Sequence, residues 1–263
     1  MVKELLHKIL KLPDNCWVNQ KLPKTFFKRN FEITLSEKKL LDDFSIIQQM
    51  EVLALVNQET ANISAFTEPT SSYEEIVILA VQTTSEQFDK QKYKISQLIQ
   101  KYIPNPILLI IYDYNRLIIS VAEKRINSND ATKRVIEKEY ITDIITTETV
   151  DEKQEHFFEN LAFDKANKLD LRHYYNHFIQ SVVGLQTAQI KGTFVARPIE
   201  QSKENVLILE QILALQDQIN SLENIARKET QVAEMVKWNI KINENRIEIK
   251  QLTEKLNGTI KLA

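Results

Sequence analysis

Glycine is almost absent from this sequence, and its scarcity limits the folds and ligands open to the chain. Only Gly184, Gly192 and Gly258 occur among 263 residues, so no glycine precedes residue 184. Phosphate-binding loops and dinucleotide-binding folds need glycine, because its backbone adopts positive φ and lets a ligand approach closely. The sequence therefore argues against P-loop, Rossmann and kinase-type sites, and it predicts no cofactor.

Composition indicates a globular protein with no membrane partner. Hydrophobic residues make up 43% of the chain and charged residues 27%, and the formal net charge is −2. No run approaches the roughly 18 apolar residues of a membrane span, and the amphipathic start MVKELLHKILKL is too short for a signal peptide, so we expect a cytoplasmic location. Cys16 is the single cysteine, which excludes an internal disulfide and favours a buried, inert thiol.

Residues 1–150 are predicted to form an α+β domain with a mixed sheet of about five or six strands and flanking helices. The near-continuous apolar runs 74–83 and 107–112 are typical of central strands that are buried on both faces. Leu98, on an expected helix, and Ile110 are predicted core residues. The other expected strands span residues 50–56, 61–66, 116–123 and 133–145, and the expected helices span 36–47 and 86–102.

A basic N-terminal arm is predicted within residues 1–30, where seven lysine and arginine residues outnumber two acidic ones. The stretch PDNCWVNQKLPKTFFKRNF has two prolines and mixed polarity, which favour a surface loop or arm. Positive charge interleaved with aromatic rings suits phosphate contact and base stacking, although lysines on a surface are often only solvated. The candidate nucleic-acid contacts are Trp17, Lys21, Lys24, Phe27, Lys28 and Arg29.

Residues 151–195 are expected to form a helical segment and a connector, and residues 196–263 a helical tail. Apolar residues in the tail recur at alternating steps of three and four, the spacing of a helix-to-helix seam. The candidate seam residues are Ile208, Ile212, Leu215, Ile219, Leu222, Met235, Trp238, Ile242, Asn245, Ile249 and Leu252.

The seam changes register at RKETQ, which leaves two arrangements open for the tail. Either the chain turns there into an antiparallel hairpin, or one long helix presents different faces along its length. The matched lengths of the two halves favour the hairpin. Asn245 either selects register or partner as a polar core residue, or points outward from the seam. In both arrangements the tail is expected to pack against helices, of its own chain or of another.

Four segments carry a resemblance to a known family. KLPKTFF, EEIVILAVQTT, YIPNPILLII and KETQVAEMVKWNIKINE resemble, in this order and spacing, the bacterial family catalogued as domain of unknown function 4391. This resemblance implies an accessory protein of restriction or phage-defence gene clusters, encoded beside a helicase and a DNA methyltransferase. It supplies no catalytic residue.

The expected order of helix, three strands, helix and strand is similar to the core of restriction-type nucleases. Such enzymes need a carboxylate on the second strand and an acidic residue with a lysine two positions later on the third, to hold magnesium and activate water. The triplet Gln82, Thr83 and Thr84 lacks these groups, and Glu59 or Glu68 alone would not complete a site. The sequence therefore favours a degenerate nuclease-like or an unrelated α+β fold over an active nuclease.

A pair of histidines, His173 and His177, has the i, i+4 spacing that allows two imidazoles to bind one metal. No glutamate follows His173 and no cysteine lies nearby, so a polar helix face is the preferred interpretation and no metal site is predicted.

Three functions remain in order of preference. The first is a non-catalytic interaction subunit that works with a helicase or methyltransferase, or by self-association, through its helical tail. The second is a nucleic-acid-binding module on a degenerate nuclease-like fold, with DNA as the possible partner. The third is a metal-dependent nuclease.

Overall fold

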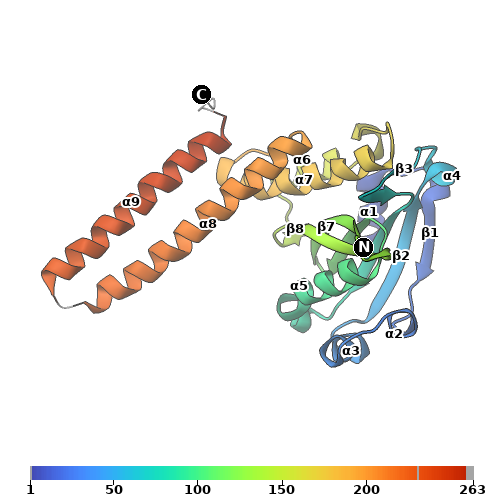
Figure 1. Ribbon diagram of the computed structural model, residues 1–263, viewed down its shortest axis with the longest axis horizontal. Coiled ribbons are helices and arrows are strands. Elements are labelled where there is room, and N and C mark those ends of the chain that lie inside the picture. Colours follow the sequence, from blue (N-terminus) through green and yellow to red (C-terminus); the bar gives the residue numbers. More distant parts are fainter. Residues whose placement is uncertain (1, 230, 259–263) are drawn as a thin grey trace.

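The computed structural model describes residues 2–229 and 231–258, and Figure 1 shows an α+β body from which two long helices, α8 and α9, project. Thr230, in the predicted turn, and residues 259–263, at the end of the predicted tail, lie outside the described residues. The helices are α1 (Val2–Leu10), η1 (Asp14–Cys16), α2 (Thr25–Asn30), α3 (Leu35–Asp42), α4 (Gln58–Ala61), α5 (Ser85–Tyr102), α6 (Glu152–Asn160), η2 (Phe163–Lys165), α7 (Leu171–Lys191), α8 (Ile199–Lys228) and α9 (Val232–Leu256). The strands are β1 (Trp17–Lys21), β2 (Gln49–Val56), β3 (Phe66–Glu68), β4 (Ser71–Tyr73), β5 (Ile76–Gln82), β6 (Ile107–Tyr112), β7 (Arg116–Asn127), β8 (Asp130–Ile141) and β9 (Ile145–Thr146).

The predicted α+β class with a mixed sheet is confirmed. One sheet has the strand order β1-β2-β5-β6-β7-β8, with β9 paired to β7. β5 and β6 are parallel and are connected through α5, whereas the other neighbours in this sheet are antiparallel. This mixture follows from the connections, because parallel neighbours need a long crossover and antiparallel ones can be joined by short turns.

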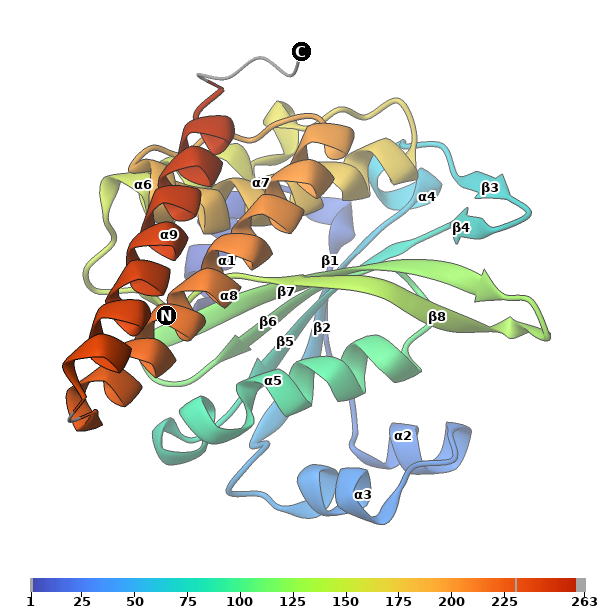
Figure 2. The same cartoon turned by 60° about the vertical axis from the view of Figure 1, so that its left-hand side comes forward.

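Helices cover both faces of the sheet, as Figure 2 shows: α1, α6 and α7 lie on one side, and α2, α3 and α5 on the other. Side chains of β5 alternate between the two faces, so that Ile78 and Ala80 belong to the first core and Leu79 and Val81 to the second. The apolar runs predicted to be central strands are therefore buried on both faces. Leu98 and Ile110 are buried, as predicted.

The stretch predicted as an irregular arm is instead folded onto the sheet. β1 pairs with β2 at the sheet edge, and α2 follows it. The reason is apolar packing: Phe27 of α2 is fully buried in the core beneath the sheet, where Leu22 and Phe26 pack beside it. Cys16 is buried as expected, and its thiol donates a weak hydrogen bond to the carbonyl of Thr60.

Two predicted elements between residues 36 and 66 are shorter or different in the structure. The helix expected at 36–47 ends at Asp42, so Phe44 is 69% exposed rather than on a buried helix face. The strand expected at 61–66 is absent: Asn57 caps the short helix α4, and β3 pairs only with β4 in a separate two-stranded sheet. Side-chain caps compete with strand pairing here, because Asn57 accepts bonds from two backbone amides of α4.

The tail forms a hairpin, one of the two arrangements that the sequence left open. α8 and α9 lie side by side and antiparallel in Figures 1 and 2, with Ile212, Leu252 and Leu256 in a common apolar cluster. The start of α8 is held on the body by ion pairs from Lys203 to Glu123 (2.7 Å) and from Lys138 to Glu210 (2.6 Å). No helix within the described residues is long and apolar enough to cross a membrane.

Candidate functional site

Lys3, Gln49 and Glu51 form a polar cluster on the α1 side of the sheet. In a restriction-type nuclease, metal-binding carboxylates would lie on the second and third strands, so we compare this cluster with such a site. The predicted run of three consecutive strands is interrupted in the structure by α4 and by the separate β3–β4 sheet. Within the main sheet, β1, β2 and β5 come before α5 and β6 along the chain, so β2 and β5 are its second and third strands. β2 carries the buried Glu51, which stands opposite Ala80 of β5 in register. Lys3 of α1 forms an ion pair with Glu51, and the Gln49 side-chain amide donates to the same carboxylate at 2.8 Å.

This cluster lacks the groups that bind a catalytic metal. On β5, the positions beside Glu51 hold Ala80 and, two residues later, Gln82, in place of an acid and a lysine. The Glu51 carboxylate is already neutralised by the Lys3 ammonium, and a single carboxylate is a poor magnesium site. Nowhere in residues 2–229 and 231–258 do three or more histidine, cysteine or acidic side chains gather as a metal site would require.

A shallow cavity of about 420 Å³ adjoins the cluster. It is lined by Val2, Lys3, Glu4, Gln82, Tyr112, Asp113 and Tyr114. Burial and the negative charge of Glu51 raise the pKa of the Tyr112 hydroxyl, so this hydroxyl stays protonated at neutral pH. The Asp113 carboxylate forms an ion pair with the Arg116 guanidinium at 2.6 Å. Of the polar groups that line the cavity, Lys3 and Asp113 are therefore already ion-paired within the protein.

The two histidines of α7 are engaged separately, in keeping with a structural role. The His173 ring lies 2.8 Å from the Asp170 carboxylate, and the His177 ring is bonded to the Asn160 carbonyl. Burial lowers the pKa of His177, although the bond to Asn160 opposes that shift. Each ring thus has a different partner, and the pair does not point at a common ligand.

The structure does not bring the six predicted nucleic-acid contacts onto one open surface. Phe27 is fully buried, so its ring is not available to stack on bases, which corrects the expectation for this residue. Trp17 is partly buried and stacks on His7 with ring centroids 3.4 Å apart. Lys28 forms an ion pair with Asp42. Lys21, Lys24 and Arg29 remain at least partly exposed, on β1, before α2 and within α2 respectively.

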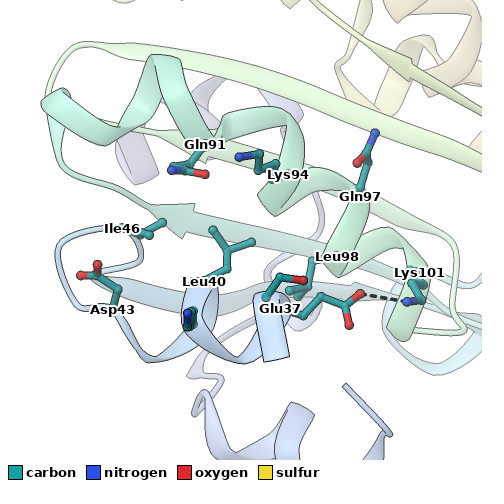
Figure 3. A pocket seen from close by; sticks show the side chains of 11 residues that line it. Glu37, Leu40, Asp43, Ile46, Gln91, Lys94, Gln97, Leu98 and Lys101 are labelled. Atoms are coloured by element: carbon teal, nitrogen blue, oxygen red, sulfur yellow. Dashed lines mark hydrogen bonds and ion pairs between the residues drawn. The ribbon is translucent and has the colours of Figure 1, made fainter. Parts of the chain in front are cut away.

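A groove between α3 and α5 is a second surface with exposed lysines, and the carboxylates Glu37 and Asp43 line it as well (Figure 3). It has a volume of about 620 Å³ and is lined by Ser36, Glu37, Lys39, Leu40, Asp43, Ile46, Gln91, Lys94, Gln97, Leu98 and Lys101. Lys39 and Lys94 are exposed there. At the end of α3 lies the exposed Phe44 ring, with the Lys24 ammonium 5.4 Å from its centroid.

Glu37 ties the two helices of this groove together. Its carboxylate accepts from Lys101 (2.8 Å) and from the Tyr102 hydroxyl (2.8 Å) of α5, and from the Thr34 amide (2.7 Å) in the capping box of α3. Burial raises the pKa of the Glu37 carboxyl, but these hydrogen bonds outweigh burial and lower it to about 2. Glu37 is therefore charged at neutral pH and links α3 to α5 beside the groove.

The predicted seam residues are all buried or partly buried in the structure. Ile212, Ile219, Ile242 and Leu252 are buried, and Ile208, Leu215, Leu222, Met235, Trp238, Asn245 and Ile249 are partly buried. The Asn245 side-chain amide donates to the Gln218 side chain at 3.3 Å, so this polar residue bridges to α8 rather than pointing outward. The seam is filled within the chain and is not the surface that is left for a partner.

A second apolar stripe on α9 was missed by the sequence analysis. Val236, Ile240 and Ile247 are 51%, 53% and 51% exposed. At about 100° per residue, these side chains and Asn243 fall within an arc of about 60°, on the side of α9 opposite the seam. The spacing 236, 240, 243, 247 repeats the steps of four and three that revealed the seam, so a search for a second stripe on the same helix would have found it.

These observations define a class: an α+β protein with a helix-covered mixed sheet, a Lys3–Glu51 ion pair between α1 and the sheet, and a projecting helical hairpin. Residues 10–249 match the family described as "Domain of unknown function (DUF4391)", and the chain belongs to this family. No curated protein and no solved structure is significantly similar to the chain.

Proposed function

We propose that the protein is a non-catalytic accessory subunit of a bacterial phage-defence or restriction complex, and that it works in the cytoplasm with a helicase or a DNA methyltransferase. The observation that carries the proposal is the α8–α9 hairpin, which projects from the body and exposes apolar side chains on its outer surface. Solvent-exposed stripes of large apolar residues are typical of protein-binding surfaces. The gene neighbourhoods of the family that the sequence resembles supply the candidate partners.

The composition of the sheet cluster supports a non-catalytic role. Hydrolysis of a phosphodiester with magnesium needs carboxylates that hold the ion and a base or lysine that activates water. The one carboxylate at the second-strand position, Glu51, is paired with Lys3 and bonded to Gln49. This pairing supports a structural use of the cluster, in which α1 is fastened to the sheet.

The test is co-purification with the candidate partners. The tagged full-length chain is co-expressed with the neighbouring helicase and methyltransferase, and the proteins retained on the tag are identified and quantified. Wild type should retain one of them, and Ile219→Asp, which opens the hairpin, should lose it. A chain with Asn220→Asp has the same added charge at an exposed neighbouring position and should behave as wild type. If Ile219→Asp retained as much partner as wild type, the closed hairpin would not be needed for partner binding.

A nucleic-acid-binding module is the second candidate, favoured by the groove between α3 and α5. Exposed lysines and an exposed aromatic ring suit phosphate contact and base stacking: Lys39 and Lys94 line the groove, and the exposed Phe44 ring lies beside the Lys24 ammonium just after α3. Fluorescence anisotropy with a single-stranded and a duplex oligonucleotide tests it at two salt concentrations. Binding should weaken steeply with salt, because each neutralised phosphate releases counterions, and Phe44→Ala should weaken binding of the single strand. Absence of binding at low salt would rule the module out.

A further inference from the structure

The outer stripe of α9 has the properties of a helix-pairing surface. Val236, Ile240, Asn243 and Ile247 lie on the side of α9 that faces away from α8. This part of α9 belongs to the portion of the hairpin that projects beyond the body in Figure 1, so the body does not cover it. On α8 the exposed apolar residues do not form such a stripe: Leu207 and Ile225 are about 27 Å apart along the helix, and Leu213 points to another side.

The stripe is self-complementary when two copies run antiparallel. With a twofold axis at the centre of the stripe, Val236 of one copy meets Ile247 of the other, and Ile240 meets Asn243. Both ends of the stripe thus bury an aliphatic pair. At the centre, Asn243 of each copy lies against Ile240 of the other, so the fully aliphatic contacts lie at the two ends of the stripe.

Charge on the flank of the stripe fits the same arrangement. Lys237 and Glu244 occupy the same flanking position one heptad apart, on the same edge of the stripe. In the antiparallel pair Lys237 of each copy comes beside Glu244 of the other, so two opposite-charge contacts form by symmetry. Both side chains are exposed, and Lys237 is held at 2.5 Å by Glu234 of its own helix. On the other edge Asn239 faces Arg246, which brings no like charges together.

We propose that the protein self-associates through this stripe into an antiparallel dimer of hairpins, so that the accessory subunit presents two α+β bodies at opposite ends of the paired α9 helices. This inference rests on the proposed function only in taking the hairpin as an interaction element. The occupant is a second copy because the stripe and its flanking charges match themselves. The contact is small, so the dimer forms reversibly as the protein concentration rises.

Sedimentation of the full-length chain between about 1 and 200 µM tests the dimer, since the mass of a reversible dimer depends on protomer concentration. The mass should rise from that of one chain toward that of two. Ile240→Asp should keep the mass of one chain, while Asn220→Asp on α8 should match wild type. Circular dichroism of each variant checks that helix content is retained. A wild-type chain that stays at the mass of one chain throughout would overturn the proposal.

A charge exchange tests the antiparallel register. Lys237→Glu and Glu244→Lys should each weaken dimerisation about tenfold, and the double variant should restore it to within about threefold of wild type. Lys237→Glu also removes the ion pair with Glu234 of the same helix, but it does so equally in the single and the double variant. Dimerisation that is restored in the double variant therefore reports the contact between position 237 of one copy and position 244 of the other. If the double variant is as weak as the single ones, or if the single ones match wild type, the register is wrong.

The outcome also separates this inference from the proposed function. Suppose that the wild-type chain is monomeric and co-purifies with its partner, and that the Ile219→Asp variant does not. This result would rule out the dimer and would leave the proposed function standing. A dimer that obeys the charge exchange, formed by a chain that retains neither the helicase nor the methyltransferase, would end the proposed function alone.

Discussion

At the scale of single residues, Glu37 shows how one carboxylate organises a surface. It completes the capping box of α3 and accepts from Lys101 and Tyr102 of α5, so it fixes the distance between the two helices that line the groove. Because its pKa is lowered from 4.5 to about 2, folding favours its charged form. The stability that this carboxylate adds is complete above pH 4.5 and is lost as the pH falls through about 2.

Replacement of Glu37 by Gln should therefore destabilise the protein in a pH-dependent way. We expect the free energy of unfolding at pH 7 to fall by about 1 to 3 kcal/mol, because hydrogen bonds to a charged group are lost. Between pH 4.5 and about 2 the difference from wild type should shrink, as the wild-type carboxylate becomes protonated. Denaturant unfolding at several pH values measures it, with Glu32→Gln at an exposed position as the control. A difference that stays constant with pH would contradict the assigned pKa.

At the scale of elements, the hairpin depends on its seam. Ile219 is buried between α8 and α9, and burial of such a side chain contributes about 1.5 to 3 kcal/mol. Asp at this position would lose that contribution and would place a charge in an apolar contact. We expect Ile219→Asp to expose residues 203–256 to limited proteolysis at any protein concentration, while the body stays resistant. Asn220→Asp should be cleaved as slowly as wild type. Equal cleavage of Ile219→Asp and wild type would show that the seam does not hold the hairpin closed.

The elements that could be predicted from the sequence are those whose signal is local. β5 and β6 stand out because both faces of each strand are buried, and the hairpin seam because its spacing repeats every heptad. β1 could not be recognised in the same way: it is a mostly exposed edge strand whose pairing with β2 is set by residues far along the chain. The ion pair from Lys3 to Glu51 joins residues that are 48 positions apart, so no local pattern reveals it. The outer stripe of α9 also has a local sequence pattern, but it contains only three apolar residues, whereas the seam on the same helix contains more and was recognised first.

At the scale of the whole molecule, the chain consists of two parts, the α+β body and the projecting α8–α9 hairpin. The helix-covered sheet is a body whose Lys3–Glu51 ion pair joins α1 to β2, and we propose that the hairpin is the part that meets other proteins. An enzyme would depend on the cluster around Glu51, whereas an interaction subunit depends on the hairpin. The two interpretations therefore assign the biological activity to residues at opposite ends of the chain.

Protection of cells against phage infection tests this division most directly. Cells that carry the whole gene cluster are infected, and plaque counts are compared for wild type, Glu51→Gln and Ile219→Asp, each checked for expression and for a folded body by its thermal midpoint. The account predicts that Glu51→Gln protects as well as wild type and that Ile219→Asp does not protect. Loss of protection with a folded Glu51→Gln chain, together with full protection by Ile219→Asp, would contradict the account and would mark the sheet cluster as the working site.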